Sequence, residues 1–292
     1  MVRNIAPVMA DLDAEDFYLL SGIEHGMRFS KWVDRRKLPK FAGLDRQETE
    51  FRIDRCMQFE LIEQQTIQYV GYRLRFEGYD ALALRAFSER ETIEAVGSPL
   101  GEGKESDVYE ALADEPVAIK FHREGVTNFR EVQRERDYTA DHAHRSWMYT
   151  ARKAAEREYT VLTDLTPGVS VPKPIDQNRH AIVMERMSGI QLARADLSES
   201  NPRVVYDRIV AELAATYAAG YVHTDISEYN IVISDLSVTI FDWPQAVSLD
   251  HPNAGEFLER DVVNLRSFFK RKYPRDFADF PTKSQTITEI CQ

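Results

Sequence analysis

The sequence has little of what marks a membrane or secreted protein. Its two cysteines, Cys56 and Cys291, are far apart and have no metal-ligand spacing, which favours reduced thiols in a cytosolic protein. No uncharged apolar run approaches the roughly 20 residues that a membrane helix needs. The N-terminal segment lacks a signal-peptide core, because Asp11 and Asp13 come early. We therefore expect a cytoplasmic protein with no membrane partner.

Positive charge is also scarce. The 292 residues include 37 Lys and Arg against 48 Asp and Glu, a formal net charge of -11. This balance argues against binding nucleic acid or anionic membrane over the whole surface, but it allows a local basic patch. Apolar residues make up 43% of the chain, which is ample for a core and excludes a disordered chain. The length suits one large domain or two ordinary ones.

The N-terminal part of the chain predicts small helices followed by a β-hairpin. Helical spacing runs over residues 12–26, a short second helix is expected at residues 30–38, and Asp45 can cap a third. Apolar and polar residues then alternate over much of residues 67–79, which favours a strand or hairpin. Three helices and a β wing make a winged-helix domain, a variant of helix-turn-helix.

The pattern of predicted secondary structure changes from residue 97 onward. The predicted strands span residues 107–111, 117–121, 181–185, 231–234 and 238–241, and the predicted helices about 145–165, 202–219 and 256–272. Strands followed by helices favour an α+β architecture over a parallel doubly wound sheet. We therefore expect a winged-helix domain at residues 1–81, a linker helix at residues 82–96 and a second domain at residues 97–292.

Three glycine-rich phosphate-binding patterns compete for residues 100–109. The Walker pattern fails, because Ser98 stands where it needs Gly. The Rossmann fingerprint fails at Ser106 for the same reason, and the region lacks a βαβ context. The kinase pattern G-x-G-x-x-G-x-V is met at Gly101, Gly103 and Val108.

Small residues in this loop let backbone amides approach phosphate oxygens, while Ser106 can add a hydroxyl donor and Lys104 a charge. By itself the loop could equally be a hairpin turn. The next predicted strand changes that balance, because it ends in Val-Ala-Ile-Lys120, the kinase pattern whose Lys contacts nucleotide phosphates. A carboxylate should hold this Lys. We prefer Glu158, which shares the apolar face of its helix, with a solvated Glu as the alternative.

Residues 223–230, His-Thr-Asp-Ile-Ser-Glu-Tyr-Asn, form the strongest motif. Asp225 and Asn230 have the spacing of the kinase catalytic loop. Asp225 would orient the nucleophile or accept its proton, and the Asn230 amide oxygen would bind Mg²⁺, a hard ion that prefers oxygen ligands. His223 is more a structural hydrogen-bonding residue than a base. A short hairpin should then return a second metal ligand, Asp242, toward Asn230.

Some parts of ordinary protein kinases are missing. Asp242 is followed by Trp243-Pro244 instead of Phe-Gly, and Thr224 replaces the Arg that usually grips a phosphorylated activation loop. No Ala-Pro-Glu segment follows, and only about 50 residues remain after Asp242. We therefore expect neither activation-loop control nor a broad surface for protein substrates.

Together these motifs resemble the RIO family of atypical kinases, in the archaeal form of the winged-helix subfamily called RIO kinase two. The motifs that support the resemblance are residues 101–109, 119–123, 180–185, 223–230 and 241–245. The resemblance spans nearly the whole chain. It implies a small bilobal kinase domain, with an N-lobe at residues 97–184 and a C-lobe at residues 188–292.

The resemblance also implies cofactors and a role. It implies ATP with Mg²⁺ or Mn²⁺, an adenine-binding hinge at Met184, Glu185 and Met187, and autophosphorylation. It further implies serine/threonine kinase or ATPase activity in maturing the small ribosomal subunit, with the precursor subunit, its rRNA and its ribosomal proteins, as partner. Residues 122–144 would form a loop near the nucleotide, although a solvated helical extension fits them equally. We expect a monomer.

A ribosomal partner requires contact with RNA, and the candidate patch lies in the predicted winged helix. Its cations are Lys31, Arg35, Arg36, Lys37 and Lys40, with Arg52 and Arg55 on the next helix. They could neutralise phosphates, and the helix with Arg52 and Arg55 would correspond to the recognition helix. Acidic residues interrupt that helix, so a solvated charged face is the alternative.

Two rival functions fit part of the sequence. A small-molecule kinase of the aminoglycoside-phosphotransferase type shares the catalytic motif, but it needs a larger C-terminal lobe to form an acceptor pocket. A non-catalytic assembly factor would use nucleotide only as a conformational switch. Such a factor would lack a catalytic group, yet Lys120, Asp225, Asn230 and Asp242 are all present. We therefore expect real but slow turnover, gated by the ribosomal precursor.

Overall fold

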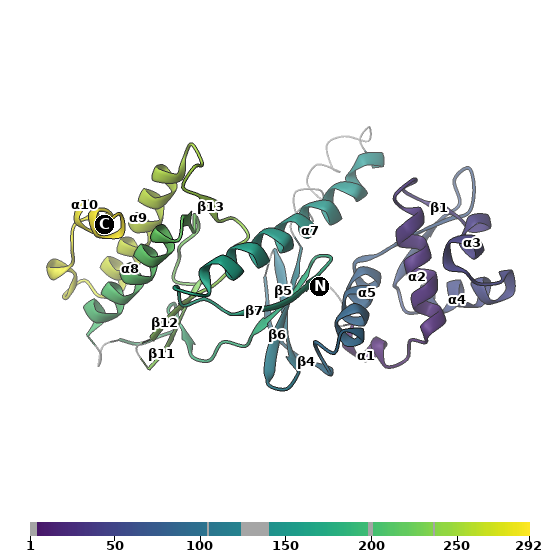
Figure 1. The fold of residues 1–292 in the computed structure, drawn as a ribbon, viewed down its shortest axis with the longest axis horizontal. Helices are drawn as coiled ribbons and strands as arrows, with labels where there is room; N and C mark the ends of the chain where they lie inside the picture. The colour runs from purple at the N-terminus through teal and green to yellow at the C-terminus, as the bar shows by residue number, and fades with distance from the viewer. Residues whose placement is uncertain (1–4, 104, 124–139, 198–200, 236) are drawn as a thin grey trace. The chain divides into compact units, whose positions relative to one another are not determined.

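The structure is a computed structural model that describes residues 5–103, 105–123, 140–197, 201–235 and 237–292 (Figure 1). The chain divides into two compact units. The first comprises Met1–Lys153 with Asp176–Val183, and the second comprises Ala154–Ile175 with Met184–Gln292. Within the described ranges, no helix has the length and apolarity needed to cross a membrane.

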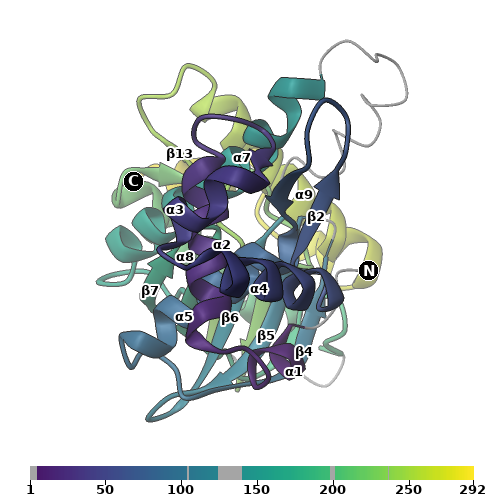
Figure 2. The ribbon, with the colours of Figure 1, turned by 90° about the vertical axis from the view of Figure 1, so that its right-hand side faces the viewer.

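The first unit begins with the winged helix (Figure 2). Its elements are α1 (Ala6–Met9), α2 (Ala14–Gly26), β1 (Val33–Asp34), η1 (Arg35–Lys37), α3 (Leu38–Ala42), α4 (Arg46–Gln58), β2 (Ile62–Gln65), β3 (Gly71–Leu74) and α5 (Phe76–Glu89). Helix α2 packs against α3 and α4, and the antiparallel sheet has the order β1-β3-β2. As predicted, the Asp45 side chain caps α4, accepting from the Glu48 N–H at 2.8 Å.

Two local predictions in the winged helix are wrong. Residues 30–38 form a strand and a 3-10 turn instead of a helix that stops before Pro39. Pro39 lies in the first turn of α3, where its missing N–H leaves no helical bond unmade. The predicted hairpin is also shifted, because residues 76–79 already belong to α5. The close approach of the Leu61 carbonyl requires Gly78 there, since an added Cβ would clash with it.

The second half of the first unit is built on a five-stranded sheet in which β4, β5 and β6 are antiparallel. Its strands are β4 (Ala95–Glu102), β5 (Ser106–Leu112), β6 (Pro116–His122), β7 (Pro174–Asn178) and β8 (Ala181–Glu185), in the order β4-β5-β6-β8-β7. The central strands β5, β6 and β8 were predicted, whereas the edge strands β4 and β7 were not. Pro99 and Gly101 disturb the alternation of β4, and the register shifts at both. One apolar core continues from Leu20 of α2 through Phe87 of α5 to Ile119 of β6.

The second unit is mostly helical. It contains the C-terminal part of α7 (Ala140–Leu165), from Ala154 onward, then β9 (Ile190–Gln191), α8 (Pro202–Ala218), β10 (Tyr221–Val222), β11 (Ile231–Ser234), β12 (Ser237–Ile240), β13 (Val247–Ser248), α9 (Ala254–Lys272), η2 (Phe277–Asp279) and α10 (Lys283–Ile290). The aromatic rings of Tyr206, Phe269 and Phe280 meet in its core. The predicted strands and helices of this region are confirmed, and the α+β class holds.

Candidate active site

The β11–β12 hairpin positions the two predicted metal ligands. Ile231 pairs with Ile240, and the Phe241 N–H donates to the Asn230 carbonyl at 3.0 Å. Asp242 follows with φ 71°, a left-handed conformation that is uncommon outside glycine. The prediction that a short hairpin returns Asp242 toward Asn230 is therefore confirmed.

Hydrogen bonds fix the orientation of Asn230. Its side-chain amide nitrogen donates to the Asp225 carbonyl at 2.9 Å, and its backbone N–H donates to the Ser227 carbonyl at 3.1 Å. Because the amide nitrogen makes this bond, the amide oxygen is the atom suited to a metal ion. The Asp225 side chain is exposed, as a residue that receives a substrate proton must be.

His223 is buried and bridges two parts of the loop. Its Nδ1 accepts from the Asp225 N–H at 3.3 Å, and its Nε2 lies 3.1 Å from the Phe241 carbonyl, to which it donates. Burial lowers the pKa of His223, which favours the neutral ring that this donor–acceptor pattern requires. The geometry thus gives His223 a structural role.

Asp261 of α9 binds the backbone of the catalytic loop, and this role was not predicted. Its two carboxylate oxygens accept from the Thr224 N–H at 2.8 Å and the Ile226 N–H at 3.0 Å. Burial raises the pKa of Asp261 to about 6, and the two backbone hydrogen bonds oppose that rise. Thr224, with φ 72°, is left-handed. A single acid among the apolar positions of α9, beside Leu258 and Val262, is the sequence pattern that could have identified Asp261.

Trp243 ties Glu158 to the metal-ligand segment. The Trp243 N–H donates to the Glu158 carboxylate at 3.0 Å, and its indole N–H donates to the Ile240 carbonyl at 3.0 Å. The indole is fully buried against the His223 ring, with 4.4 Å between ring centroids. Glu158 is itself buried. Its predicted pairing with Lys120 stays a prediction.

In the first unit, sheet register brings the phosphate-loop residues together. Gly101 pairs with Val108 across β4 and β5, and Val108 pairs with Lys120 across β5 and β6. The Gly103 N–H donates to the Ser106 carbonyl at 2.8 Å and closes the turn. Lys120 is largely buried. Lys104 lies outside the described residues, as does most of the predicted loop at residues 122–144.

These residues fit a metal ion that arrives with a nucleotide. The described ranges contain no group of three or more His, Cys, Asp or Glu side chains that could hold an ion without other ligands. Asn230 and Asp242 supply oxygen ligands from two positions. Mg²⁺ commonly takes only one or two protein ligands and completes its shell with phosphate oxygens and water.

The predicted hinge residues lie where the two units divide, between Val183 and Met184. Met184 is buried, Glu185 is exposed, and Met187 is half-buried. The Glu185 N–H donates to the Lys173 carbonyl at 2.8 Å. Adenine binding at these residues stays a prediction.

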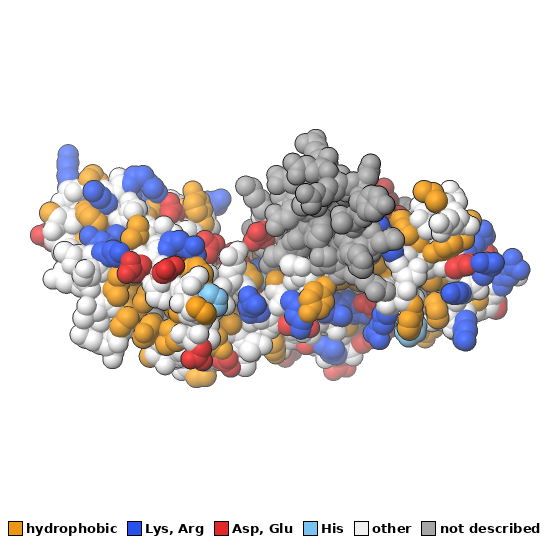
Figure 3. Space-filling model, turned by 90° about the horizontal axis from the view of Figure 1, so that it is seen from above, with side chains coloured by type: hydrophobic (Ala, Val, Ile, Leu, Met, Phe, Trp, Pro, Cys, Tyr) orange, Lys and Arg blue, Asp and Glu red, His pale blue; other side chains and the backbone are white. Residues whose placement is uncertain are grey.

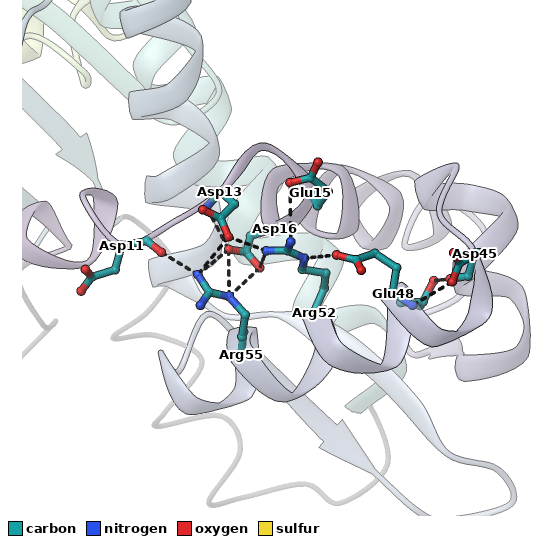
Figure 4. Close-up of polar contacts among 9 residues, drawn as sticks. Asp11, Asp13, Glu15, Asp16, Asp45, Glu48, Arg52 and Arg55 are labelled. Carbon is teal, nitrogen blue, oxygen red and sulfur yellow. Dashed lines mark hydrogen bonds and ion pairs between the residues drawn. The ribbon is translucent and has the colours of Figure 1, made fainter.

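The predicted RNA-contact residues differ in their environments. Arg52 is 8% exposed, and its guanidinium is held by Asp13 at 2.7 Å, Asp16 at 3.3 Å and Glu48 (Figure 4). Arg55 pairs with Asp16 at 3.0 Å. This geometry assigns both arginines a structural role in joining α4 to α2.

The other candidate cations lie nearer to solvent. Arg35 pairs with Glu50, while the Arg36 side chain is 83% exposed beside Asp34. Lys37 and Lys40 are exposed, and Lys31 is half-buried.

The fold and the ordered motifs define an atypical, protein-kinase-like enzyme. Residues 107–282 match the RIO domain family, and residues 9–90 match the Rio2 N-terminal family. The chain therefore belongs to the Rio2 family of RIO-type serine/threonine-protein kinases.

Relatives occur in archaea and eukaryotes. The chain is 39% identical over 260 residues to the RIO-type serine/threonine-protein kinase Rio2 of Methanocaldococcus jannaschii, covering 87% of this chain and 95% of that protein. It is 36% identical over 288 residues to the serine/threonine-protein kinase RIO2 of Caenorhabditis elegans, covering 96% of this chain. The chain spans about half of the worm protein, 54% of its length.

A solved relative has the same architecture. The Rio2 kinase of Chaetomium thermophilum, crystallised as an ADP/Mg²⁺-phosphoaspartate complex, superposes with a TM-score of 0.83 at 30% identity. The match covers 98% of this chain and 89% of that one.

Proposed function

We propose that this protein is an ATP-dependent serine/threonine kinase or ATPase that acts in maturation of the small ribosomal subunit. The observation that supports catalysis is the built geometry of the catalytic loop, in which Asp225 is exposed and Asn230 is oriented beside the segment of Asp242. The Chaetomium thermophilum relative bound ADP and Mg²⁺, which supports ATP with Mg²⁺ as the cofactors here. The partner and a cytoplasmic location belong to this proposal.

The phosphate-binding residues of the first unit position the nucleotide. Small residues at Gly101 and Gly103 let backbone N–H groups approach the phosphates. Lys120, one strand away from the loop, neutralises phosphate charge from a largely buried position. Burial strengthens this interaction, because the effective dielectric constant is lower than in water.

The catalytic residues of the second unit act on the transferred group. Asp225 orients the attacking hydroxyl or water and accepts its proton. Asn230 and Asp242 would hold Mg²⁺, which would neutralise negative charge on the phosphate oxygens. The hydrogen bonds to His223 and Asp261 keep these groups in place before the nucleotide binds.

Slow turnover through a phosphorylated aspartate is part of this proposal, because the Chaetomium thermophilum relative was crystallised with a phosphoaspartate. A carboxylate oxygen of Asp242 would attack the γ-phosphorus. The bond to the bridging oxygen breaks, ADP leaves, and water later hydrolyses the acyl phosphate. Autophosphorylation would then be transient and sensitive to hydroxylamine.

The test is ATP hydrolysis with Mg²⁺ in single-turnover and steady-state formats, with and without small-subunit particles. Asp225→Ala and Asp242→Ala should each lower the rate by roughly 10²-fold or more. Stimulation by particles supports the ribosome-coupled enzyme. If the wild type binds ATP and particles but never turns over, the protein is a nucleotide-dependent assembly factor instead.

We propose that the exposed cations of the winged helix contact the rRNA of the ribosomal partner. Figure 3 shows Lys and Arg side chains at the end that contains this domain, and Arg36, Lys37 and Lys40 are exposed there. Such contacts neutralise RNA phosphates and release counterions, so binding should weaken steeply with salt. The acidic net charge of the chain, -11, limits this binding to a local surface.

A further inference from the structure

A buried charge network lies behind the glycine-rich loop and outside the motifs used above. At its centre is Arg123, which is 4% exposed and follows the last residue of β6. Its guanidinium donates to both oxygens of Asp80 at 2.8 Å and to Asp107 at 2.8 Å. His180, directly before β8, lies 2.8 Å from Asp80 and donates to it, because a carboxylate only accepts.

The charges around Asp80 favour its ionised form. Burial alone would raise the pKa of Asp80, but the Arg123 charge and the hydrogen bond from His180 outweigh it and lower the pKa to about 2. Burial lowers the pKa of His180, so the ring stays neutral. Arg123 has little freedom to move, because all three of its guanidinium nitrogens donate to the carboxylates of Asp80 and Asp107, in a planar group whose donor directions are fixed.

Arg123 grips the glycine-rich loop at two points. Its backbone N–H donates to the Glu105 carbonyl at 2.7 Å, and its side chain holds Asp107. Between these two residues lies Ser106, whose carbonyl closes the turn with Gly103. The returning arm of the loop is therefore anchored to Arg123 by both main chain and side chain.

The counter-charge comes from the winged-helix side of the unit. Asp80 belongs to α5, the helix that directly follows the wing strand β3. The Arg123 guanidinium also lies over the ring of Phe76, at the start of α5, 5.5 Å from the ring centroid. The position of the glycine-rich loop thus depends on the carboxylate of Asp80, which belongs to α5 and not to the sheet.

We propose that Asp80 and Arg123 are positioning residues for the nucleotide, setting the glycine-rich loop from α5 of the winged-helix region. This inference rests on the proposed ATP-dependent function. It makes the winged-helix region part of the nucleotide-binding machinery in addition to any role in binding partners.

A second ion pair in the same unit provides a matched control. Arg179 holds Glu24 of α2 through two bonds of 2.9 and 2.6 Å and donates to the Leu82 carbonyl of α5. This pair also joins the winged helix to the sheet, at the β7–β8 turn. It makes no contact with the glycine-rich loop among the described residues, so its loss should affect stability without affecting the loop.

The experiment measures the Kd for Mg·ADP by calorimetry, the KM and kcat for ATP, and the Tm of the full chain. The variants are Asp80→Asn, Arg123→Lys and the milder Asp107→Asn, with Glu24→Gln as the control. We expect the Kd and KM to rise about tenfold in the first two variants, within the range of coupling between linked sites. Asp107→Asn should give a smaller rise, and Glu24→Gln should lower only the Tm.

The outcomes separate the two proposals. A wild type that does not bind Mg·ADP contradicts the proposed function. A wild type that binds, with Asp80→Asn and Glu24→Gln losing Tm equally and neither changing Kd, shows a purely structural network and overturns this inference. If Asp80→Asn does not fold, Asp107→Asn decides the question, and an unchanged Kd and KM in that variant overturn it as well.

Discussion

The catalytic loop and the glycine-rich loop are held by different chemistry. In the catalytic loop, the backbone N–H groups of Thr224 and Ile226 both donate to one carboxylate, Asp261. In the glycine-rich loop, the Arg123 guanidinium holds the side chain of Asp107, and the Arg123 backbone N–H donates to the Glu105 carbonyl. The first arrangement depends on a single acceptor, and the second depends on a balance of charges.

This difference teaches which substitutions each loop should tolerate. A loop held through its backbone should accept changes in its own side chains but not the loss of its acceptor. A loop held through paired charges should be sensitive to either partner, because a buried ion that loses its partner is left uncompensated.

The largest expected effect comes from removing the catalytic-loop acceptor. Asp261→Ala leaves two buried N–H groups without their carboxylate, which should cost about 2–4 kcal/mol of unfolding free energy. The displaced loop should lower kcat by roughly 10²-fold. Chemical denaturation and single-turnover hydrolysis measure both. A stable variant with normal kcat would show that Asp261 does not set the loop.

A pH profile should separate the two loops. The pKa of Asp261 is raised to about 6, so its protonated form is favoured in the fold and its contribution to stability falls as pH rises from about 4 to 6. Catalysis has the opposite requirement, since the carboxylate is the stronger acceptor. We therefore expect kcat to fall as pH drops through about 6.

Asp80 should behave differently over the same range. Its pKa is lowered to about 2, so its contribution is present above its ordinary value of 3.8 and is lost only as pH falls toward 2. The Kd for Mg·ADP should therefore change less than kcat between pH 5 and 7. The control is Asp261→Asn, which should remove the acid limb of kcat. Its persistence in that variant would assign the limb to another group.

The smallest effect is expected for the Thr224 side chain. Thr224→Gly relieves a left-handed φ of 72° and loses the hydroxyl bond to the Gln245 carbonyl at 3.1 Å. Each of these terms is about 1 kcal/mol, and they have opposite signs. We expect stability within about 1 kcal/mol of wild type and kcat within about threefold. A large loss would mean that this loop is held by its side chains after all.

Local sequence patterns predicted the parts of the site whose spacing is fixed along the chain. The five-residue step from Asp225 to Asn230 and the hairpin return to Asp242 are of this kind. So is the cap at Asp45.

The missed features depend on contacts between distant residues. The bond from Asp261 to Thr224 spans 37 positions, and that from Arg123 to Asp80 spans 43. The environment of Arg52 was missed as well, because a local sequence pattern does not show that an arginine pairs with acids 36 and 39 residues away. Strand β4 was missed for a local reason, because the register shifts around Pro99 interrupt the alternation of apolar and polar residues.

Trp243 bears on the choice of inhibitors. In ordinary protein kinases the residue after the metal-binding aspartate is a Phe whose packing distinguishes active from inactive states. Here that position is a fully buried Trp, whose backbone N–H donates to Glu158, whose ring nitrogen donates to the Ile240 carbonyl, and whose ring packs in an edge arrangement with His223. Moving the indole outward would break its hydrogen bond to Ile240 and its ring contact with His223. Compounds that require such an outward movement should therefore spare this enzyme, and selective ligands should be sought among those that leave the indole in place.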